Sequence, residues 1–389
     1  MIETVAPGPA STVDSHDLDG NLATPPDRDR VADLVRVGSL GVVIVWHSTL
    51  SLFHRNSEGV LTMPNPVGSY RGLWMLTWVL QVMPLFFIVS GSVNAEAWNR
   101  HHQRGGGLTA FVRRRVGRFT APLAMLVALC AVAELTGRAL NGQPFITRHL
   151  VILVPLWTLG LLMAYAPATA MLDRAWRRFG TTTTVWLGSI VVLSDLVRFR
   201  AGSDLAAVAQ TVSTIGVWLV AYQLGWVYRA AVAQGAEATR GTGRVLASVG
   251  FVGLVVTTNI DVYPRPMVAT TTDSMSNLLP TTVPVMMLAL LQCGLLLVFR
   301  PRLAAWLDRD QMRGRLDALG GYALPAYLLH MIVVVAMVLA LEATGLGLSD
   351  VPTVAWWITR PLWLAAVVAL MIPMIRASGR LLESDTRVD

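Results

Sequence analysis

Residues 322–344 read YALPAYLLHMIVVVAMVLALEAT, and Glu342 is the one charged residue in this run. A helix that crosses the hydrocarbon core of a bilayer needs about 20 mostly apolar residues, so the run is long enough to span it. Similar runs recur along the chain, separated by short links that carry arginine. This recurrence predicts a membrane protein with several spanning helices.

The composition of the whole chain excludes an ordinary soluble fold. Of its 389 residues, 54% are hydrophobic and 14% are charged, and the mean hydropathy is +0.54. Soluble domains carry roughly 25% charged residues, so this chain has too little polar surface to face water. We therefore predict an all-α, polytopic integral membrane helix bundle of about ten transmembrane helices.

Long apolar runs bounded by charge or turn residues give the positions of the spans. They lie near residues 35–53, 74–97, 119–136, 149–171, 184–199, 211–229, 245–260, 280–299, 322–344 and 354–375. The fifth run is short and carries Asp195, so we expect it to tilt, kink or pair with a neighbouring helix. The spans define an integral membrane domain over residues 31–376, between a disordered cytoplasmic tail at 1–30 and a cytoplasmic tail at 377–389.

The positive charge of the chain follows a membrane pattern. The net charge is +7, but the arginines lie between apolar runs and form no basic domain, so no nucleic-acid partner is predicted. About 23 of the 31 arginines fall in alternate links. Positively charged links stay in the cytoplasm during insertion, so we predict an even number of spans and two cytoplasmic termini. The predicted location is the inner (plasma) membrane, with the lipid bilayer as a partner.

The first span carries the leading candidates for chemistry, because ionisable residues are costly in a bilayer. His47 lies eleven residues after Arg36, on nearly the same helix face and roughly 16 Å away along the axis. Arg36 can hold an anion at the cytoplasmic end, and His47 can accept a proton from a substrate hydroxyl. An acyl-CoA would satisfy both. The alternative is a snorkelling boundary arginine and a histidine that bonds to another helix.

Two further segments offer polar or basic side chains at helical spacing. Ser90 lies four residues before Asn94 on one face of the second span, where it would contact substrate or serve helix packing. Arg115 and Arg118 lie three residues apart before the third span. They could dock a diphosphate, although positive-inside topology also places arginine there.

Three further histidines lie in two segments of the chain. His330 lies three residues after Tyr327 in the ninth span, where it fits either a cavity shared with the first histidine or a structural role. His101 and His102 precede a glycine-rich link. Because no third ligand follows at suitable spacing, we predict no metal site.

In their order along the chain, these segments resemble the acyltransferase-3 family of integral membrane acyltransferases. Arg36 and His47 match the family's pattern of arginine, ten residues and histidine in the first helix. Phe86-Phe87-Ile88-Val89-Ser90-Gly91 resembles its second-helix Phe-Phe-x-x-Ser-Gly motif. These two motifs carry most of the resemblance.

Three later segments extend the resemblance to about residue 335. Residues 113–122 resemble the family's basic stretch that leads to a proline, and Trp157 is similar to a tryptophan of the fourth helix. Tyr327 and His330 resemble the Tyr-x-x-His of a late helix.

The resemblance implies transfer of an acyl group, commonly acetyl from acetyl-CoA, to a hydroxyl of a carbohydrate, lipid-linked glycan or secondary metabolite. Acyl-CoA is then a donor substrate, and no permanently bound cofactor is expected. The implied catalytic residue is His47, and the implied substrate-binding residues are Arg36, Ser90, Arg115, Arg118, Trp157, Tyr327 and His330. Two other classes stay open, a transporter or flippase that uses intramembrane histidines and a non-catalytic sensor or scaffold.

Overall fold

A computed structural model of the protein describes residues 29–269, 275–345, 348 and 351–385. Within this part of the chain the structure is almost entirely helical, with one hairpin made of β1 His54–Arg55 and β2 Leu61–Thr62. Nine of the described helices are long and apolar enough to cross a membrane. The predicted all-α polytopic membrane fold is therefore confirmed. The tail predicted at residues 1–30 lies outside the described residues except for its last two positions.

Ten long helices correspond in order to the predicted spans. They are α1 Arg30–Thr49, α3 Met83–Gln103, α5 Thr120–Asn141, α7 Leu156–Phe179, α8 Thr182–Arg200, α9 Ser203–Ala233, α10 Ala236–Thr257, α11 Val283–Leu307, α12 Asp310–Ala343 and α13 Val354–Asp385. In α8, Asp195 accepts hydrogen bonds from Ser213 Oγ of α9 at 2.8 Å and from the amide of Val283 at 2.9 Å. The expected pairing of Asp195 with a neighbouring helix is confirmed.

Of the ten long helices, α10 is the one that is not among the nine candidate membrane-crossing helices, because its first half carries arginine. Four of its exposed side chains form one stripe along the helix, namely Val245, Val249, Val252 and Val256. The helix packs against α11. An apolar outward stripe is suited to lipid, so α10 fits the bundle as a tenth helix.

The second predicted span, 74–97, corresponds to a candidate membrane span over Leu73–Gln103, but the helix is interrupted within it. α2 Leu76–Leu80 ends before Gln81, and α3 begins at Met83 with Pro84 in its first turn. Proline has no amide hydrogen, so it is favourable at the start of a helix and cannot continue the preceding turn. The carbonyl of Gln81 instead accepts a hydrogen bond from Gln292 Nε2 of α11 at 2.8 Å. The interruption places Gln81 in the wall of a cavity.

Several elements differ from the sequence prediction or were not predicted. The short ones are η1 Pro66–Ser69, η2 Leu73–Met75, α4 Leu108–Gly117, α6 Phe145–Arg148 and η3 Leu150–Leu153. α12 begins at residue 310, twelve residues before the predicted span, and α13 continues to Asp385, beyond the predicted domain end at 376.

The hairpin after α1 is attached to distant parts of the chain by Arg55. Its Nε and Nη2 atoms each donate to a carboxylate oxygen of Glu342 at 2.7 Å. Its Nη2 also lies 3.2 Å from His149 Nε2. His149 Nδ1 lies 2.7 Å from the carbonyl oxygen of Phe145, which only accepts, so in the neutral ring Nε2 accepts the hydrogen bond from Arg55. Because an arginine–carboxylate pair of this kind is geometrically specific, the hairpin has a fixed position beside α12.

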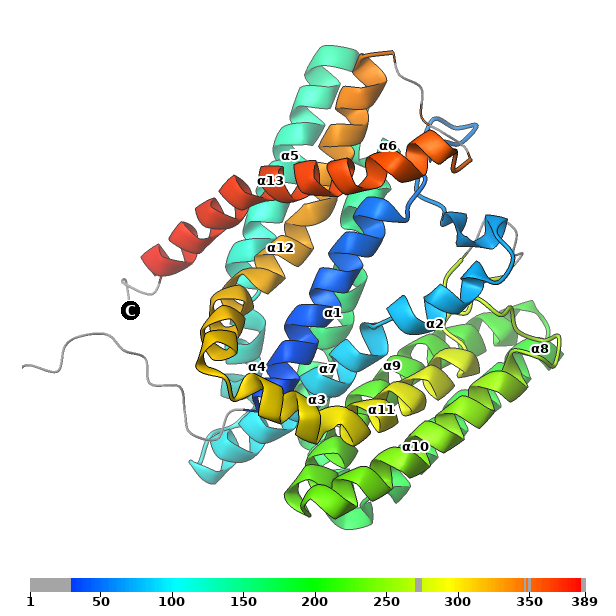
Figure 1. Ribbon diagram of the computed structural model, residues 1–389, viewed down its shortest axis with the longest axis vertical. Coiled ribbons are helices and arrows are strands. Elements are labelled where there is room, and N and C mark those ends of the chain that lie inside the picture. The colour runs from blue at the N-terminus through cyan, green and yellow to red at the C-terminus, as the bar shows by residue number, and fades with distance from the viewer. Residues whose placement is uncertain (1–28, 270–274, 346–347, 349–350, 386–389) are drawn as a thin grey trace, which may run out of the picture.

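The helices form two groups with a central set between them (Figure 1). α8, α9, α10 and α11 pack together on one side, and α5, α12 and α13 lie on the other. α1, α3 and α7 lie between these groups, and α1 contacts both α3 and α12. The side chains that α1, α3, α7 and α12 turn toward one another form the candidate site.

α3 and α9 approach so closely that their backbones touch at two glycines. A Cβ atom added to Gly91 would overlap the carbonyl oxygen of Tyr222, and one added to Gly225 would overlap the amide of Ser92. Small residues at helix crossings allow such close packing in membranes. Gly91 therefore fixes the position of α3, which carries Ser90.

We expect Gly91→Ala to lower the melting temperature of the purified protein, because overpacking against a backbone atom typically costs about 1–3 kcal/mol. Gly160→Ala on α7 is the matched control, since a Cβ there meets no atom within 4 Å. Thermal unfolding followed by tryptophan fluorescence in detergent compares the two variants. Equal melting temperatures would show that the crossing can relax at no cost.

Candidate functional site

One helix connects the two halves of the candidate site. α1 begins at an N-cap, Asp29, whose carboxylate accepts hydrogen bonds from the amides of Val31 and Ala32. The helix then continues without a break, so Arg36 and His47 lie about three turns, or roughly 16 Å, apart. Arg36 lines one cavity and His47 lines another.

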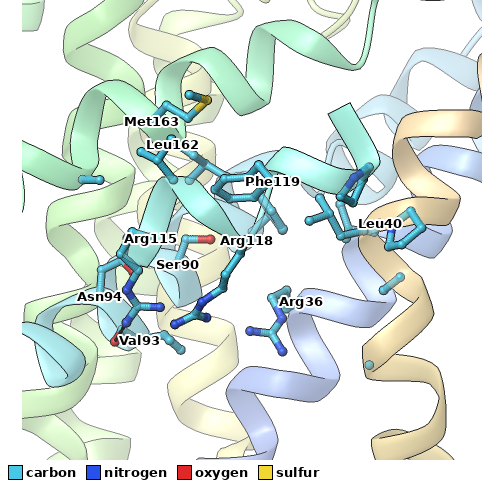
Figure 2. A pocket seen from close by; sticks show the side chains of 18 of the residues that line it. Arg36, Leu40, Ser90, Val93, Asn94, Arg115, Arg118, Phe119, Leu162 and Met163 are labelled. Atoms are coloured by element: carbon cyan, nitrogen blue, oxygen red, sulfur yellow. Dashed lines mark hydrogen bonds between the residues drawn. The ribbon is translucent and has the colours of Figure 1, made fainter. Parts of the chain in front are cut away.

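The first cavity, here called the arginine cavity, has a volume of about 270 Å³. Its polar lining consists of Arg36, Ser90, Asn94, Arg115 and Arg118. Figure 2 shows that the guanidinium group of Arg36 on α1 and those of Arg115 and Arg118 at the end of α4 point into the same space. The predicted pairs Ser90 with Asn94 and Arg115 with Arg118 thus each share a face, as their spacing indicated.

The arginine cavity is strongly positive. Arg36 Nη2 donates to Asp33 Oδ1 at 2.8 Å, and Arg115 Nη2 donates to the carbonyl of Val93 at 3.3 Å. Among the residues that the structure describes, no carboxylate is in ion-pair contact with Arg115 or Arg118. Burial and the charge of Arg118 lower the pKa of Arg115 to about 10, so it stays protonated at neutral pH. Binding an anion would relieve this repulsion.

A hydrogen-bond chain holds the polar wall of the arginine cavity. Asn94 Nδ2 donates to the hydroxyl of Tyr222 on α9 at 2.7 Å. That hydroxyl also lies 2.7 Å from Thr169 Oγ1 of α7. Three helices therefore fix the side chain of Asn94 next to Ser90.

The second cavity, here called the histidine cavity, has a volume of about 220 Å³. His47, Trp157 and Tyr327, all predicted site residues, line it. Met63, Pro64 and Asn65 come from the loop after the hairpin, and Val268, Ala269 and Leu278 come from the loop before α11. Two loops that the predicted topology places on the outer side thus meet at His47.

His47 and His330 form a direct pair. His47 Nδ1 lies 3.0 Å from His330 Nε2, and His330 Nδ1 lies 2.5 Å from the carbonyl oxygen of Tyr327. A carbonyl only accepts, so Nδ1 of a neutral His330 carries the proton and its Nε2 accepts from His47. In this tautomer His47 Nε2 keeps its lone pair. The buried His330 therefore orients His47 and leaves it one free basic nitrogen.

Tyr327 and Trp157 fix the surroundings of the histidine pair. The Tyr327 hydroxyl donates to Thr158 Oγ1 of α7 at 3.0 Å. The Trp157 ring packs against Phe87 and Trp218, with ring centroids 6.3 Å and 5.1 Å away. These contacts join α7 to α12, α3 and α9 at the level of the cavity.

One ionisable residue of a predicted span lies outside both cavities, and some lining residues were missed. Asp195 binds Ser213 and Val283 and lines neither cavity. Among the described residues, no three His, Cys, Asp or Glu side chains are grouped as a metal site would require. The missed residues are Asn65 and Gln81, because an amide in a loop or at a helix break has no distinctive sequence pattern.

Comparisons with known proteins give one finding. A family model described as an acyltransferase domain matches residues 31–376, which include α1 after its first residue and every residue that lines the two cavities. Comparison with curated proteins gave no match, and comparison with solved structures gave none.

Proposed function

Because the chain belongs to the acyltransferase-3 family of integral membrane acyltransferases, we propose that it transfers an acyl group, acetyl being the simplest, from acyl-CoA to a hydroxyl. The acceptor is a carbohydrate, a lipid-linked glycan or a secondary metabolite. The observation that carries the proposal is the His47–His330 pair, which leaves a basic nitrogen on His47, a residue that lines a cavity. General-base catalysis of attack by a hydroxyl needs such a nitrogen.

The arginine cavity is the proposed site for the phosphates of CoA. Three guanidinium groups suit the recognition of phosphate, and the pantetheine arm of CoA separates the phosphates from the thioester. Three helices line both cavities, with lining residues of the two cavities about one turn apart on each helix. These pairs are Leu40 and Val43, Phe86 and Met83, and Leu324 and Tyr327. The shared walls support a path for the arm toward His47.

In the proposed reaction, His47 Nε2 takes the proton of the acceptor hydroxyl as the hydroxyl oxygen bonds to the thioester carbonyl carbon. The tetrahedral intermediate then collapses with cleavage of the carbon–sulfur bond. The proton on His47 passes to the departing thiolate, which restores the base. His330 keeps His47 in the required tautomer through both steps.

The arginine distribution gives the proposed orientation. The arginine cavity contains Arg36, Arg115 and Arg118, which belong to the arginine-rich side of the bundle, so we place that cavity at the cytoplasmic surface. Both termini are then cytoplasmic, and the histidine cavity opens toward the outer loops. The enzyme would be a multi-pass protein of the inner (plasma) membrane.

Acetyl-CoA labelled in its acetyl group provides the test. Membranes that contain the protein should move the label into a hydroxyl-bearing glycan, lipid or metabolite fraction and release one free CoA thiol for each acetyl transferred. Membranes without the protein are the control. Gradient-driven uptake of a solute without thiol release would instead support a transporter.

A further inference from the structure

We infer that Gln81 is a specificity-determining residue that binds an uncharged ring-sized group of the acceptor in the histidine cavity. This inference rests on the proposed function. Gln81 is 7% exposed and lines the cavity. It stands at the break between α2 and α3, where its backbone carbonyl accepts from Gln292.

The Gln81 side chain has a defined orientation. Its Oε1 accepts from the amide of Met83 at 3.4 Å, so the opposite end of the carboxamide is the NH₂ group. Among the described residues, Nε2 has no hydrogen-bond partner. A carboxamide donor in a cavity wall is satisfied only by a group inside the cavity, because leaving it unpaired is costly.

Asn65 repeats the same arrangement from another segment. It is 6% exposed, lines the cavity, and its Oδ1 accepts from the amide of Val67 at 2.9 Å. Its Nδ2 has no partner among the described residues. Of these two amides, Asn65 has a fully buried donor and Gln81 does not, so it is through Gln81 that the cavity recognises an oxygen atom of a ligand.

The rest of the lining selects against charge. Among the described residues that line the histidine cavity there is no Asp, Glu, Arg or Lys. An ionised carboxylate or phosphate placed there would lose its hydration without gaining a counter-charge. The aromatic residues Trp46, Trp157 and Tyr327 instead offer apolar surface. The volume, about 220 Å³, is below the roughly 300–1,000 Å³ of sites that enclose drug-sized ligands, so it accommodates a single ring.

Binding of small glycosides tests the inference without acyl transfer. Saturation-transfer NMR on the protein in nanodiscs would compare methyl β-D-glucopyranoside and methyl β-D-galactopyranoside with their C6 carboxylate counterparts. We expect the wild type to bind at least one uncharged glycoside about tenfold more tightly than its carboxylate. Gln81→Met, which keeps the size and removes the donors, should weaken that binding about 3- to 10-fold. Gln103→Met, at the exposed end of α3, is the control and should bind like the wild type.

The outcomes separate the two proposals. No binding of either uncharged glycoside, equal binding of a carboxylate, or unchanged binding by Gln81→Met would overturn the inference. Binding that depends on Gln81 together with a failure to release CoA thiol from acetyl-CoA would support the inference and contradict the acyltransferase proposal. Melting temperatures of the Gln81→Met and wild-type proteins exclude a folding defect as the cause of lost binding.

Discussion

His47→Ala will lower the rate of acyl transfer by about 10²–10⁴-fold, the usual contribution of a general base, and will leave acyl-CoA binding intact. The nitrogen proposed to take the hydroxyl proton is lost, whereas the arginine cavity lies about three helical turns away on α1. Release of CoA thiol measures transfer, and protection of the protein against thermal unfolding by acetyl-CoA measures binding. His102→Ala is the matched control, because His102 is exposed and lines neither cavity.

His330 gives a second check of the same chemistry, because in the proposed mechanism it acts through His47. The His330→Leu substitution removes the Nε2 acceptor, so His47 is no longer held in one tautomer. Acyl transfer should therefore also slow. His330→Gln retains an acceptor oxygen and should recover part of the rate. Wild-type turnover by His47→Ala would show that the base is another group. Equal rates for the two His330 variants would show that the pair is structural.

The fold was largely predictable because membrane insertion depends on local composition. Each apolar run of about 20 residues specifies a helix without reference to the rest of the chain, so even the short run around Asp195 forms α8. The interruption at Gln81 combines Pro84 in the first turn of α3 with a tertiary contact, the hydrogen bond from Gln292, which lies 211 residues away. A hydropathy pattern does not contain that information.

The site was predictable in part for the same reason. Arg36 with His47 and Ser90 with Asn94 share helix faces at fixed offsets, and the structure places each pair as its spacing indicates. The partnership of His47 with His330 joins residues 283 positions apart. Sequence spacing identified both histidines as candidates, but only the packing of α1 against α12 determines which nitrogens meet.

Arg118→Ala will raise the dissociation constant for acetyl-CoA by about 10- to 100-fold. Hydrogen bonds to charged groups contribute about 1.5–3 kcal/mol, and each 1.4 kcal/mol is a factor of ten in affinity. Arg118 is the clearest of the three arginines to test, because Arg36 is paired with Asp33 and Arg115 is bonded to the carbonyl of Val93. Equilibrium binding to protein in nanodiscs measures the change.

Arg113→Ala distinguishes a specific phosphate contact from a general loss of positive charge. Arg113 and Arg118 belong to the same basic segment, and both are exposed, but Arg113 does not line the arginine cavity. The two variants therefore change the net charge equally and differ in whether the removed arginine lines the arginine cavity. If phosphate binds in the cavity, Arg118→Ala weakens acetyl-CoA binding far more than Arg113→Ala does. Added salt does not abolish this difference, because contacts inside a cavity are less screened than those at a surface. Equal effects of the two substitutions would mean that arginine in this segment serves membrane orientation, and that the phosphates of CoA bind elsewhere.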